Sequence, residues 1–424
     1  MGLIVQKYGG TSVADPDRMR AVAENVAFTK RHGADVVVVV SAMGKATDNL
    51  IALAGQVSTS RPGREMDMLL TTGERVAAAL LTMALADLGV PAVSFTGSQV
   101  GIITDDTHGK AKIVEVKGNR VRDALAAGKI PVVAGFQGVS TTNEITTMGR
   151  GASDLTASAL AKALDADACE IYTDVTGVFS ADPRLVPRAR KLARVSFDEM
   201  LEMAGAGSKV LALRSVEFAR THGVALHVRS AFTWEPGTWV TDTNPDTGET
   251  ERTMEDPIIS GVVTDSSESK VTVHQVPDRP GISAQLFEPL AAANVNVDMI
   301  VQNTSTDGMT DISFTMPSSD MHVAEDIVKR VAQEIGATGG VTHDDAIGRL
   351  SVVGAGMKSS PGIAARMFRT LADEGVNIEM ISTSTIRISV VVAIVDIERA
   401  ARALHSAFGL DSGSDYAAPL PERR

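Results

Sequence analysis

Cysteine and closely spaced histidine pairs are scarce in this sequence, and both shortages limit its chemistry. The single cysteine, Cys169, excludes an intramolecular disulfide and a cluster of thiolate metal ligands. It lies in an apolar, strand-like stretch, so we expect a buried thiol rather than a nucleophile. The 8 histidines form no HxH or HExxH pair, so we expect no metal site built from protein side chains.

Long apolar runs and an excess of positive charge are missing too. Apolar runs such as Val36 to Val40 are far shorter than a membrane span. The opening MGLIVQKYGG lacks the layout of a signal peptide, so we expect a cytoplasmic protein. A formal net charge of -12 would repel nucleic acid and anionic membranes, and we expect neither as a partner.

What is present is the composition of an ordinary globular protein in a chain of 424 residues, which predicts two or three domains. In the first half, short apolar strands alternate with helical patterns. A helix is expected from Pro16 with Asp15 as its cap, and another after a cap at Thr47 or Asp48. Strands are expected at 3–6, 35–40, 93–95, 130–134 and 170–173, and further helices at 74–88 and 120–127.

This alternation predicts an α/β fold with a mainly parallel sheet, in which the loops after the strands meet at one edge. One such loop, Gly149 to Asp154 (GRGASD), places small residues and an arginine before a helical pattern. Backbone N–H groups at a helix start, with a fixed positive charge beside them, suit a phosphate or carboxylate. The alternative is a tight turn capped by Ser153 or Asp154.

The phosphate-binding sequence GxxxxGK followed by Ser or Thr is absent, as is the protein-kinase combination of a glycine loop with HRD. Lys7, just before Gly9 and Gly10, suggests another device. An ammonium group beside exposed backbone N–H groups can follow charge that moves between two phosphates. The alternative is an ordinary surface lysine.

Arg150 and Glu74 together suit an amino acid as the substrate. A guanidinium can hold a carboxylate through two hydrogen bonds, and Glu74, expected to open its helix, can hold an ammonium group. The alternative for Glu74 is a favourable charge in a helical first turn.

If the group that binds near Lys7 is a phosphate, the reaction could be phosphoryl transfer to a carboxylate of the amino acid. A carboxylate acceptor is already ionised at neutral pH, so a kinase acting on it needs no general base. We expect ATP with Mg²⁺.

A further loop, Ile171 to Arg184, is expected to form a wall of the nucleotide site together with Gly207 to Lys209. Asp174 would contact the ribose or base, and Arg184 and Lys209 the phosphates.

The polar run Thr241 to Pro257 marks a domain boundary, and an internal repeat follows it. Residues 280–300 match residues 361–381 at a constant offset of 81. Each copy predicts a strand, a Pro-Gly turn, a helix and a strand from Val295 or Val376, which is the βαββαβ pattern of the ligand-sensing ACT module. We therefore expect a kinase-like domain over 1–245, a linker over 246–257 and ACT modules over 258–345, with a strand shared with the second module, and over 346–424.

Seven motifs in order resemble the kinase domain of the aspartate kinase family, most closely the actinobacterial type regulated by lysine and threonine. They are KYGGTS at 7–12, SAMG at 41–44, LLTTGER at 69–75, FTGSQ at 95–99, GFQG at 135–138, GRGASD at 149–154 and TDVTGVFSADPR at 173–184. The resemblance implies an amino-acid-kinase fold followed by two ferredoxin-like ACT modules. It also implies the reaction ATP + L-aspartate to ADP + 4-phospho-L-aspartate, the entry to lysine, threonine, methionine and diaminopimelate synthesis.

The resemblance also implies roles for individual residues. Lys7 would neutralise the transferring phosphoryl group, Asp154 would organise that lysine and the substrate, and Arg150 would bind the acceptor. Residues implied to bind aspartate are Ser41, Glu74, Arg150 and Ser153, the last also near phosphate. Residues implied to bind ATP are Lys7, Tyr8, Gly9, Gly10, Thr173, Asp174, Phe179, Ser180, Asp182, Pro183, Arg184 and Lys209.

Some positions depart from the family pattern. Ala152 stands where the family usually has glycine, which would restrict the backbone if a positive φ were needed there, and Thr176 replaces an acidic residue. In the implied effector site, Ala364 replaces threonine, Ser283 replaces alanine and Thr385 replaces glutamate. The rest of that site is kept, namely Asp278, Pro280, Gly281, Asn296, Asp298, Gln302, Asn377, Ile378 and Ser384.

Each lost contact in a small amino-acid pocket costs about 1–3 kcal/mol, which predicts weakened or altered inhibition by the candidate effectors lysine and threonine. Met254 stands where related enzymes start a separate small subunit, which implies an α2β2 assembly. The alternative is a homo-oligomer formed through the ACT modules. Two other functions stay open: another kinase of this fold, such as an acetylglutamate or uridylate type, and a catalytically silent amino-acid sensor.

Overall fold

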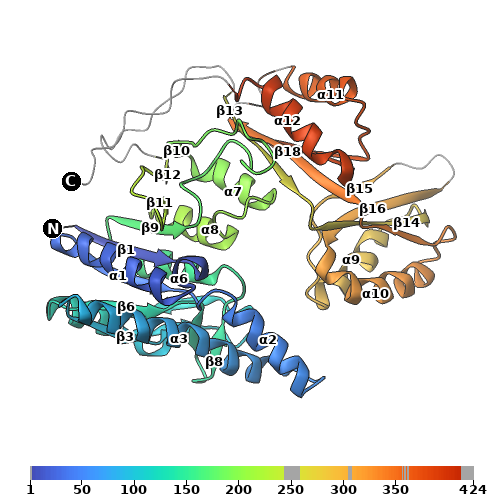
Figure 1. Cartoon of the computed structure of the whole chain (residues 1–424). Coiled ribbons are helices and arrows are strands. Elements are labelled where there is room, and N and C mark those ends of the chain that lie inside the picture. Colours follow the sequence, from blue (N-terminus) through green and yellow to red (C-terminus); the bar gives the residue numbers. More distant parts are fainter. Residues whose placement is uncertain are drawn as a thin grey trace.

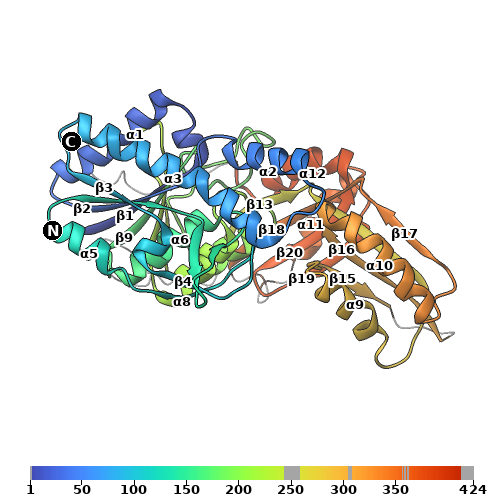
Figure 2. The same ribbon diagram turned by 90° about the horizontal axis from the view of Figure 1, so that it is seen from below.

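The computed structural model describes residues 2–242, 258–303, 308–355, 357, 360 and 362–411. The expected linker at 246–257, with Met254, lies outside the described residues, as does the chain after residue 411. Figure 1 shows a layered α/β unit formed by the first part of the chain and two smaller sheets with helices formed by the second part. Viewed at 90° in Figure 2, the large sheet lies at one end of the molecule and the two smaller sheets at the other.

The first unit is built on an eight-stranded, mainly parallel sheet in the order β10-β12-β11-β9-β1-β2-β6-β3. Of its pairs in the described residues, β11 with β12 is antiparallel and the others are parallel. The expected α/β class is thus confirmed. The strands are β1 Leu3–Tyr8, β2 Asp35–Val40, β3 Ala92–Phe95, β6 Ile130–Ala134, β9 Ala168–Thr173, β10 Arg194–Val195, β11 Leu226–Ser230 and β12 Thr238–Val240.

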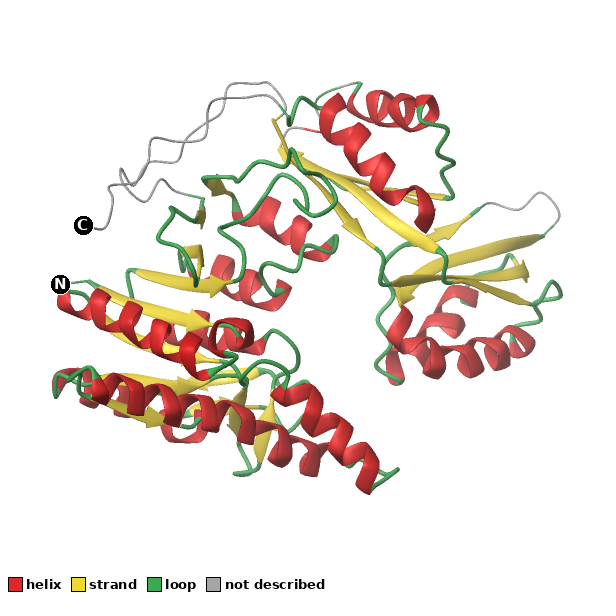
Figure 3. Cartoon of the chain, in the orientation of Figure 1, coloured by secondary structure: helices red, strands yellow, loops and turns green. Residues whose placement is uncertain are grey.

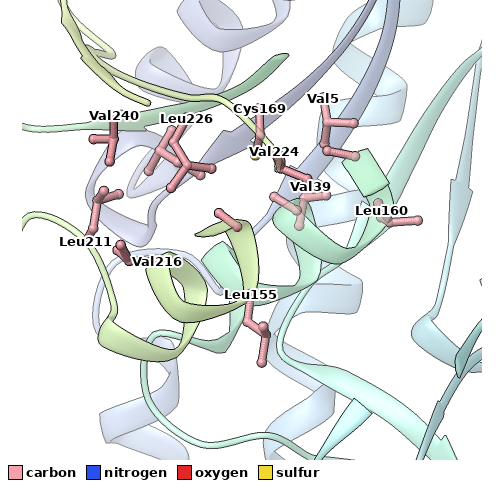
Figure 4. Packing of buried hydrophobic residues seen from close by; sticks show 14 of the residues in the cluster. Val5, Val39, Leu155, Leu160, Cys169, Leu211, Val216, Val224, Leu226 and Val240 are labelled. Atoms are coloured by element: carbon pink, nitrogen blue, oxygen red, sulfur yellow. The ribbon is translucent and has the colours of Figure 1, made fainter. Parts of the chain in front are cut away.

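Helices cover both faces of this sheet, and Figure 3 shows them running beside the strands. The alternating valines of β2 explain this arrangement, because Val36 and Val38 pack with α1 and α3 whereas Val37 and Val39 pack with α6 and α8. Figure 4 shows the second of these cores around the buried Cys169. The helices are α1 Pro16–Arg31, α2 Ala46–Val57, α3 Gly63–Asp87, α4 Gly97–Val100, α5 Asn119–Ala126, α6 Ala152–Ala163, α7 Phe197–Gly205 and α8 Leu213–His222.

A small four-stranded sheet, in the order β5-β4-β7-β8, lies in the same unit. Its last strand, β8, leads into the loop that precedes α6. The strands are β4 Ile102–Thr104, β5 Ile113–Val116, β7 Gln137–Ser140 and β8 Ile145–Thr147.

Local sequence signals were right at some helix starts and wrong at others. The side chain of Asp15 accepts a hydrogen bond from the N–H of Arg18, which confirms the expected cap of α1. The expected cap at Thr47 or Asp48 is wrong, since α2 begins after Lys45 without a side-chain cap. The expected start at Glu74 is also wrong, because Glu74 lies in the middle of α3.

Helix α3 has the length and apolar composition of a membrane span, the single such helix in the described part of the chain. Its residues Ala77, Ala78, Leu81 and Leu85 are buried against the large sheet. It is therefore a core helix of the first unit.

The second half forms two ACT-like sheets, ordered β15-β16-β14-β17 and β13-β18-β20-β19. β13 pairs with β18, so the first strand of the expected first module belongs to the sheet of the second module. The repeated strands begin at Ile300 and Met380, later than the expected Val295 and Val376. The elements are β13 Ile258–Asp265, β14 Glu268–Pro277, α9 Ile282–Ala292, β15 Ile300–Gln302, β16 Met309–Pro317, α10 Met321–Glu334, β17 Val341–Asp344, β18 Ile347–Ala355, α11 Ile363–Asp373, β19 Met380–Thr383, β20 Arg387–Ala393 and α12 Ile397–Ala407.

The second module is joined closely to the first unit. Ala181 and Val186, from the loop after β9, lie in the same hydrophobic core as Leu350 and Leu404 of that module. Ser180 Oγ lies 2.9 Å from His405 Nε2 of α12. The loop after β9 is therefore part of both units.

Candidate active site

The loops after four neighbouring strands are hydrogen-bonded to one another at one edge of the large sheet. The N–H of Ser41 donates to Tyr8 O over 3.1 Å, and the N–H of Gly9 donates to Tyr172 O over 3.3 Å. The N–H of Gly135 donates to Val40 O over 3.0 Å. The loops after β1, β2, β6 and β9 thus lie side by side, as the α/β pattern predicts.

Lys7 forms the central ion pair of this edge. It belongs to β1, which extends beyond the strand expected at 3–6, and its Nζ lies 2.6 Å from Asp154 Oδ1 in the first turn of α6. The other carboxylate oxygen, Oδ2, accepts from the N–H of Ala212 over 3.4 Å. Both charged side chains are largely buried, so the expected alternative of a surface lysine is wrong.

Gly9 and Gly10 keep the space next to Lys7 free of side chains. A Cβ on Gly9 would lie 3.4 Å from Lys7 Nζ, and one on Gly10 would collide with Ala42 O at 2.8 Å. Gly10 also begins the 3₁₀ turn Gly10–Val13. Small residues here leave room for an anion that contacts both backbone and ammonium group.

The turn before α6 uses glycine where the backbone requires it. Gly149 and Gly151 have φ values of +85° and +73°, in the left-handed region, and a Cβ on Gly151 would lie 2.5 Å from Ala212 Cβ. Ala152 does not have a positive φ, because it is the first residue of the right-handed α6. The alanine that departs from the family pattern therefore fits without backbone strain. Arg150 between the two glycines is exposed.

Ser153 and Asp154 do not cap α6, whose N-cap is Gly151, so the alternative of a side-chain cap is wrong. Ser153 is buried, and a Cβ on Gly135 would lie 2.8 Å from its Oγ. Ser153 thus lies close to the loop after β6, at the same edge as Lys7.

Glu74 brings a buried carboxyl group to this edge from α3. Its Oε1 accepts from the N–H of Ala42 over 3.1 Å, and its Oε2 has no hydrogen-bond partner among the residues that the structure describes. Burial raises the pKa of Glu74 to about 7. Gly73 makes this approach possible, since a Cβ there would lie 2.8 Å from Ala42 Cβ. A buried carboxyl with an unused oxygen is suited to a cationic ligand group.

The expected nucleotide residues after β9 are only partly together. Arg184 Nη2 lies 2.6 Å from Asp182 Oδ2, and the hydrogen bonds from Arg184, together with the charge of Lys209, lower the pKa of Asp182. Asp174, whose Oδ1 accepts from Thr173 Oγ1, carries a negative charge that helps to raise the pKa of Arg184. These exposed charges therefore share one region of the surface.

Ser180 does not belong to this exposed group. It is fully buried, its Oγ also accepts from the N–H of Arg190 over 2.8 Å, and its carbonyl accepts from the N–H of Val262. The expectation that Ser180 contacts ATP is therefore replaced by a packing role between the two units. Its neighbour Phe179 is half-buried and forms a β-bridge with Lys191.

The comparisons with known proteins agree with this arrangement. Residues 2–230 match the Amino acid kinase family, and residues 271–336 and 350–408 each match the ACT domain. An aspartokinase of Mycolicibacterium smegmatis is 54% identical over 420 residues, covering 98% of both chains. This chain belongs to the aspartokinase family. Another member, from Pseudomonas aeruginosa, is 51% identical over 412 residues, covering 97% of this chain and 98% of its own.

Solved aspartokinases have the same architecture. The structure of E. coli aspartokinase III in complex with aspartate and ADP has a TM-score of 0.79 at 25% identity, covering 96% of this chain and 99% of its own. The structure of the same enzyme with lysine and aspartate has a TM-score of 0.74 at 26% identity, covering 96% and 99%. An aspartate kinase from Synechocystis is 44% identical with a TM-score of 0.53, covering 100% of this chain and 71% of its own.

In this aspartokinase, the predicted effector residues do not form one open group. Ser283 Oγ donates to Gln302 Oε1 over 3.1 Å, which brings two of them together on the first module. Asp298 forms an ion pair with the buried Arg349 of β18, and Ser384 Oγ donates to Glu202 Oε1 of α7 over 2.8 Å, so both have partners within the chain. The remaining predicted residues are exposed or half-buried: Asp278, Pro280, Gly281, Asn296, Ala364, Asn377, Ile378 and Thr385.

Phe136 was not among the predicted site residues. It directly follows Gly135 at the end of β6 and has a φ of +70°, which is costly for a side chain of this size. Strained backbone at the loop edge of an α/β sheet is typical of a binding site. The signal in the sequence was Gly135 before it and Gly138 two residues after it in GFQG, which mark a turn but not the residue that bears the strain.

A metal site made by protein side chains is not found in the described residues, where no three His, Cys, Asp or Glu side chains are grouped for an ion.

Proposed function

We propose that this aspartokinase transfers the terminal phosphoryl group of ATP to the side-chain carboxylate of L-aspartate in the cytoplasm. The products are ADP and 4-phospho-L-aspartate, at the entry to lysine, threonine, methionine and diaminopimelate synthesis. The observation that carries the proposal is the 2.6 Å pair of Lys7 and Asp154 at the sheet edge where the loops gather. It fixes one ammonium group next to a glycine-lined space for phosphate.

For the acceptor, we assign the two charges of the amino-acid backbone to two side chains. Arg150 would hold the α-carboxylate, and Glu74, through its unpartnered Oε2, would accept from the α-ammonium group. Ser41 and Ser153, from the loop after β2 and the start of α6, would contact the rest of the molecule. The side-chain carboxylate then faces Lys7.

For the nucleotide, we assign the phosphates to Lys7, Gly9, Gly10 and the start of α6 with Ser153. Mg²⁺ would arrive with ATP and neutralise the phosphates, since magnesium keeps water and phosphate oxygens as ligands. The other contacts are assigned to Tyr8, Thr173, Asp174, Phe179, Asp182, Pro183, Arg184 and Lys209.

Positioning and charge neutralisation would supply the catalysis. An oxygen of the acceptor carboxylate forms a bond to the γ-phosphorus while the bond from that phosphorus to the bridging oxygen breaks, and ADP leaves with the electron pair. No proton has to be removed from the acceptor, because it reacts as the carboxylate. Lys7 would follow the negative charge from one side of the phosphoryl group to the other, and Asp154 keeps its Nζ in place.

Lysine and threonine are the effectors that we propose for the ACT modules, with weakened or altered inhibition. Ala364 and Thr385 lack the hydroxyl and the carboxylate that regulated members carry there. We keep the domain division at 1–245, 246–257, 258–345 and 346–424, with β13 exchanged into the second sheet. The assembly would be a homo-oligomer through the ACT modules, or α2β2 if a second product starts at Met254.

Aspartate-dependent release of ADP by the purified full-length chain tests this function. We expect ADP release that requires ATP, Mg²⁺ and L-aspartate together. Release with N-acetylglutamate or a nucleoside monophosphate instead would favour another kinase of this fold. Binding of lysine or threonine without any ADP release would favour a silent sensor.

A further inference from the structure

Helix α3 carries a second buried carboxylate, Asp67, that the proposed reaction does not use. Asp67 precedes Glu74 by seven residues, which is two helical turns, so both side chains project from the same face of α3. Asp67 is only 1% exposed. The proposed substrate contact on this helix is Glu74, not Asp67. A carboxylate buried this deeply costs free energy unless its partners satisfy it, so its partners indicate its purpose.

In the described part of the chain, the hydrogen-bond partners of Asp67 come from two segments, one around His108 and Gly109 and the other at Thr147. Its Oδ1 accepts from Thr147 Oγ1 over 2.5 Å, and its Oδ2 lies 2.8 Å from His108 Nδ1. The N–H of Gly109 lies 3.2 Å from both oxygens. Asp67 thus ties the end of β8 to the segment between β4 and β5.

Those two segments support the turn that carries Arg150. Thr147 is the last residue of β8, and Met148, Gly149 and Arg150 follow it directly. A Cβ on Gly149 would lie 3.3 Å from Gly109 O, so the turn rests on the segment that Asp67 holds.

The same turn is also held by a cation, Arg214 of α8. Arg214 donates to Met148 O over 2.6 Å and to Ala111 O over 3.0 Å. The backbone just before Arg150 is therefore held from both α3 and α8, while the Arg150 side chain itself stays exposed.

We propose that Asp67 and His108 are positioning residues for the acceptor. They fix the Arg150 turn to the helix that also carries Glu74, and so set the separation of the guanidinium and the carboxylate that receive the α-carboxylate and the α-ammonium group. The acceptor class selected in this way is an α-amino acid with both backbone charges free. The inference rests on the proposed roles of Arg150 and Glu74.

The test measures initial rates of ADP release by the variants Asp67→Asn and His108→Gln with two acceptors. One acceptor is L-aspartate, and the other is its α-amide, in which the α-carboxylate is neutralised. His108→Gln serves as the milder change if Asp67→Asn folds poorly, because His108 lies at the edge of the cluster. We expect the KM for L-aspartate to rise about tenfold and the preference for L-aspartate over the α-amide to fall by a similar factor. The KM for ATP should stay unchanged.

A matched control and a double variant distinguish a positioning role of Asp67 from a general destabilisation of the fold. Asp35→Asn removes an aspartate that pairs with Lys30 at the opposite edge of the sheet and should change neither preference nor KM. Asp67→Asn added to Arg150→Lys should have little further effect on the preference. An equal loss for both acceptors, an equal rise in the KM for ATP, or full additivity with Arg150→Lys would overturn the proposal. Failure of the proposed function is seen separately, as absence of aspartate-dependent ADP release by the unmodified chain.

Discussion

Ser180 Oγ and His405 Nε2 lie 2.9 Å apart, although 225 residues separate them in the chain. His405 is fully buried, and its Nδ1 lies 2.6 Å from Asp411 Oδ1. Ala181 and Val186 pack in the core of the second ACT module, so the loop with Asp182 and Arg184 is attached to that module. A change in the ACT region thus has a direct physical connection to the proposed nucleotide site.

Replacing Ser180 by alanine should affect ATP more than aspartate. The variant leaves His405 without its hydroxyl partner, so we expect the free energy of unfolding to fall by about 1–3 kcal/mol. The KM for ATP should rise severalfold while the KM for aspartate is unchanged, as initial rates with each substrate varied will show. Ser58→Ala, which removes an exposed hydroxyl, is the control. A rise in both KM values would argue against a specific link to the nucleotide loop.

The raised pKa of Glu74 predicts how aspartate binding depends on pH. Only the ionised carboxyl attracts an ammonium group, so the KM for aspartate should fall as the pH rises through about 7. Glu74→Gln should have a high KM that does not vary over the same range, and Glu65→Gln, an exposed change in the same helix, should behave like the unmodified enzyme. An unchanged pH profile in Glu74→Gln would contradict the assignment.

The same pKa has an effect on stability. The pKa of Glu74 in the folded chain is above its ordinary value of 4.5, so folding favours the protonated carboxyl. The stabilisation is complete below about pH 4.5 and is lost as the pH rises through about 7, at most about 3 kcal/mol. Denaturant unfolding of the ligand-free protein at pH 8 should therefore show Glu74→Gln to be more stable than the unmodified chain.

Two helical glycines should respond in opposite ways to alanine. Gly55→Ala in α2 meets no atom closer than 3.8 Å and should stabilise the protein by up to about 1 kcal/mol through helix propensity. Gly73→Ala places a Cβ 2.8 Å from Ala42 Cβ, which forces α3 away from the loop after β2. We expect this variant to raise the KM for aspartate and lower the melting temperature. Equal stabilisation by both changes would show that the loop after β2 can move away from the added methyl group without a loss of unfolding free energy.

Variants of the Lys7–Asp154 pair should separate stability from catalysis. Lys7→Gln leaves a largely buried carboxylate unpaired, which should cost about 3 kcal/mol of unfolding free energy and lower kcat by about 10²–10³. Adding Asp154→Asn removes the unpaired charge. The double variant should regain most of the stability and none of the kcat, as measured by denaturant unfolding and ADP release. Recovery of kcat would exclude Lys7 as the catalytic cation.

Inhibition by lysine and threonine should be weak in the unmodified chain. Ala364→Thr and Thr385→Glu together restore the hydroxyl and the carboxylate, and each regained contact is worth about 1–3 kcal/mol. The restored variant should show inhibition by the two amino acids at lower concentrations in initial-rate assays. Tight concerted inhibition of the unmodified chain at sub-millimolar levels would contradict this prediction.

Patterns that depend on nearby residues were predictable from the sequence. The valine run of β2 and the Asp15-Pro16 start of α1 have local causes, and the structure places both at the expected residues. The start of α3 was missed because Thr71, Thr72 and Gly73 are typical of a turn. Here the glycine instead allows α3 to approach Ala42, a contact between distant residues that no local pattern reveals.

The site was predictable to the extent that loop position follows from strand order. The sequence placed Lys7, Glu74 and Asp154 on loops or helix starts at one edge, and their side chains do lie there, although Glu74 arrives from mid-helix. Ser180 was assigned to ATP because it lies within the motif at 173–184, but its burial against His405 decides its role. The support of the Arg150 turn by Asp67 joins residues 41 and 80 positions apart and could not be read from spacing.

The exchanged strand β13 limits where the regulatory half can be cut from the rest. Any polypeptide that started beyond Asp265 would leave β18 with an open edge, ready to pair with foreign strands and to aggregate. A polypeptide starting at Met254 would retain the whole of β13 and could close both sheets by itself. If a free regulatory chain is ever made from this gene, its first residue must therefore precede Ile258.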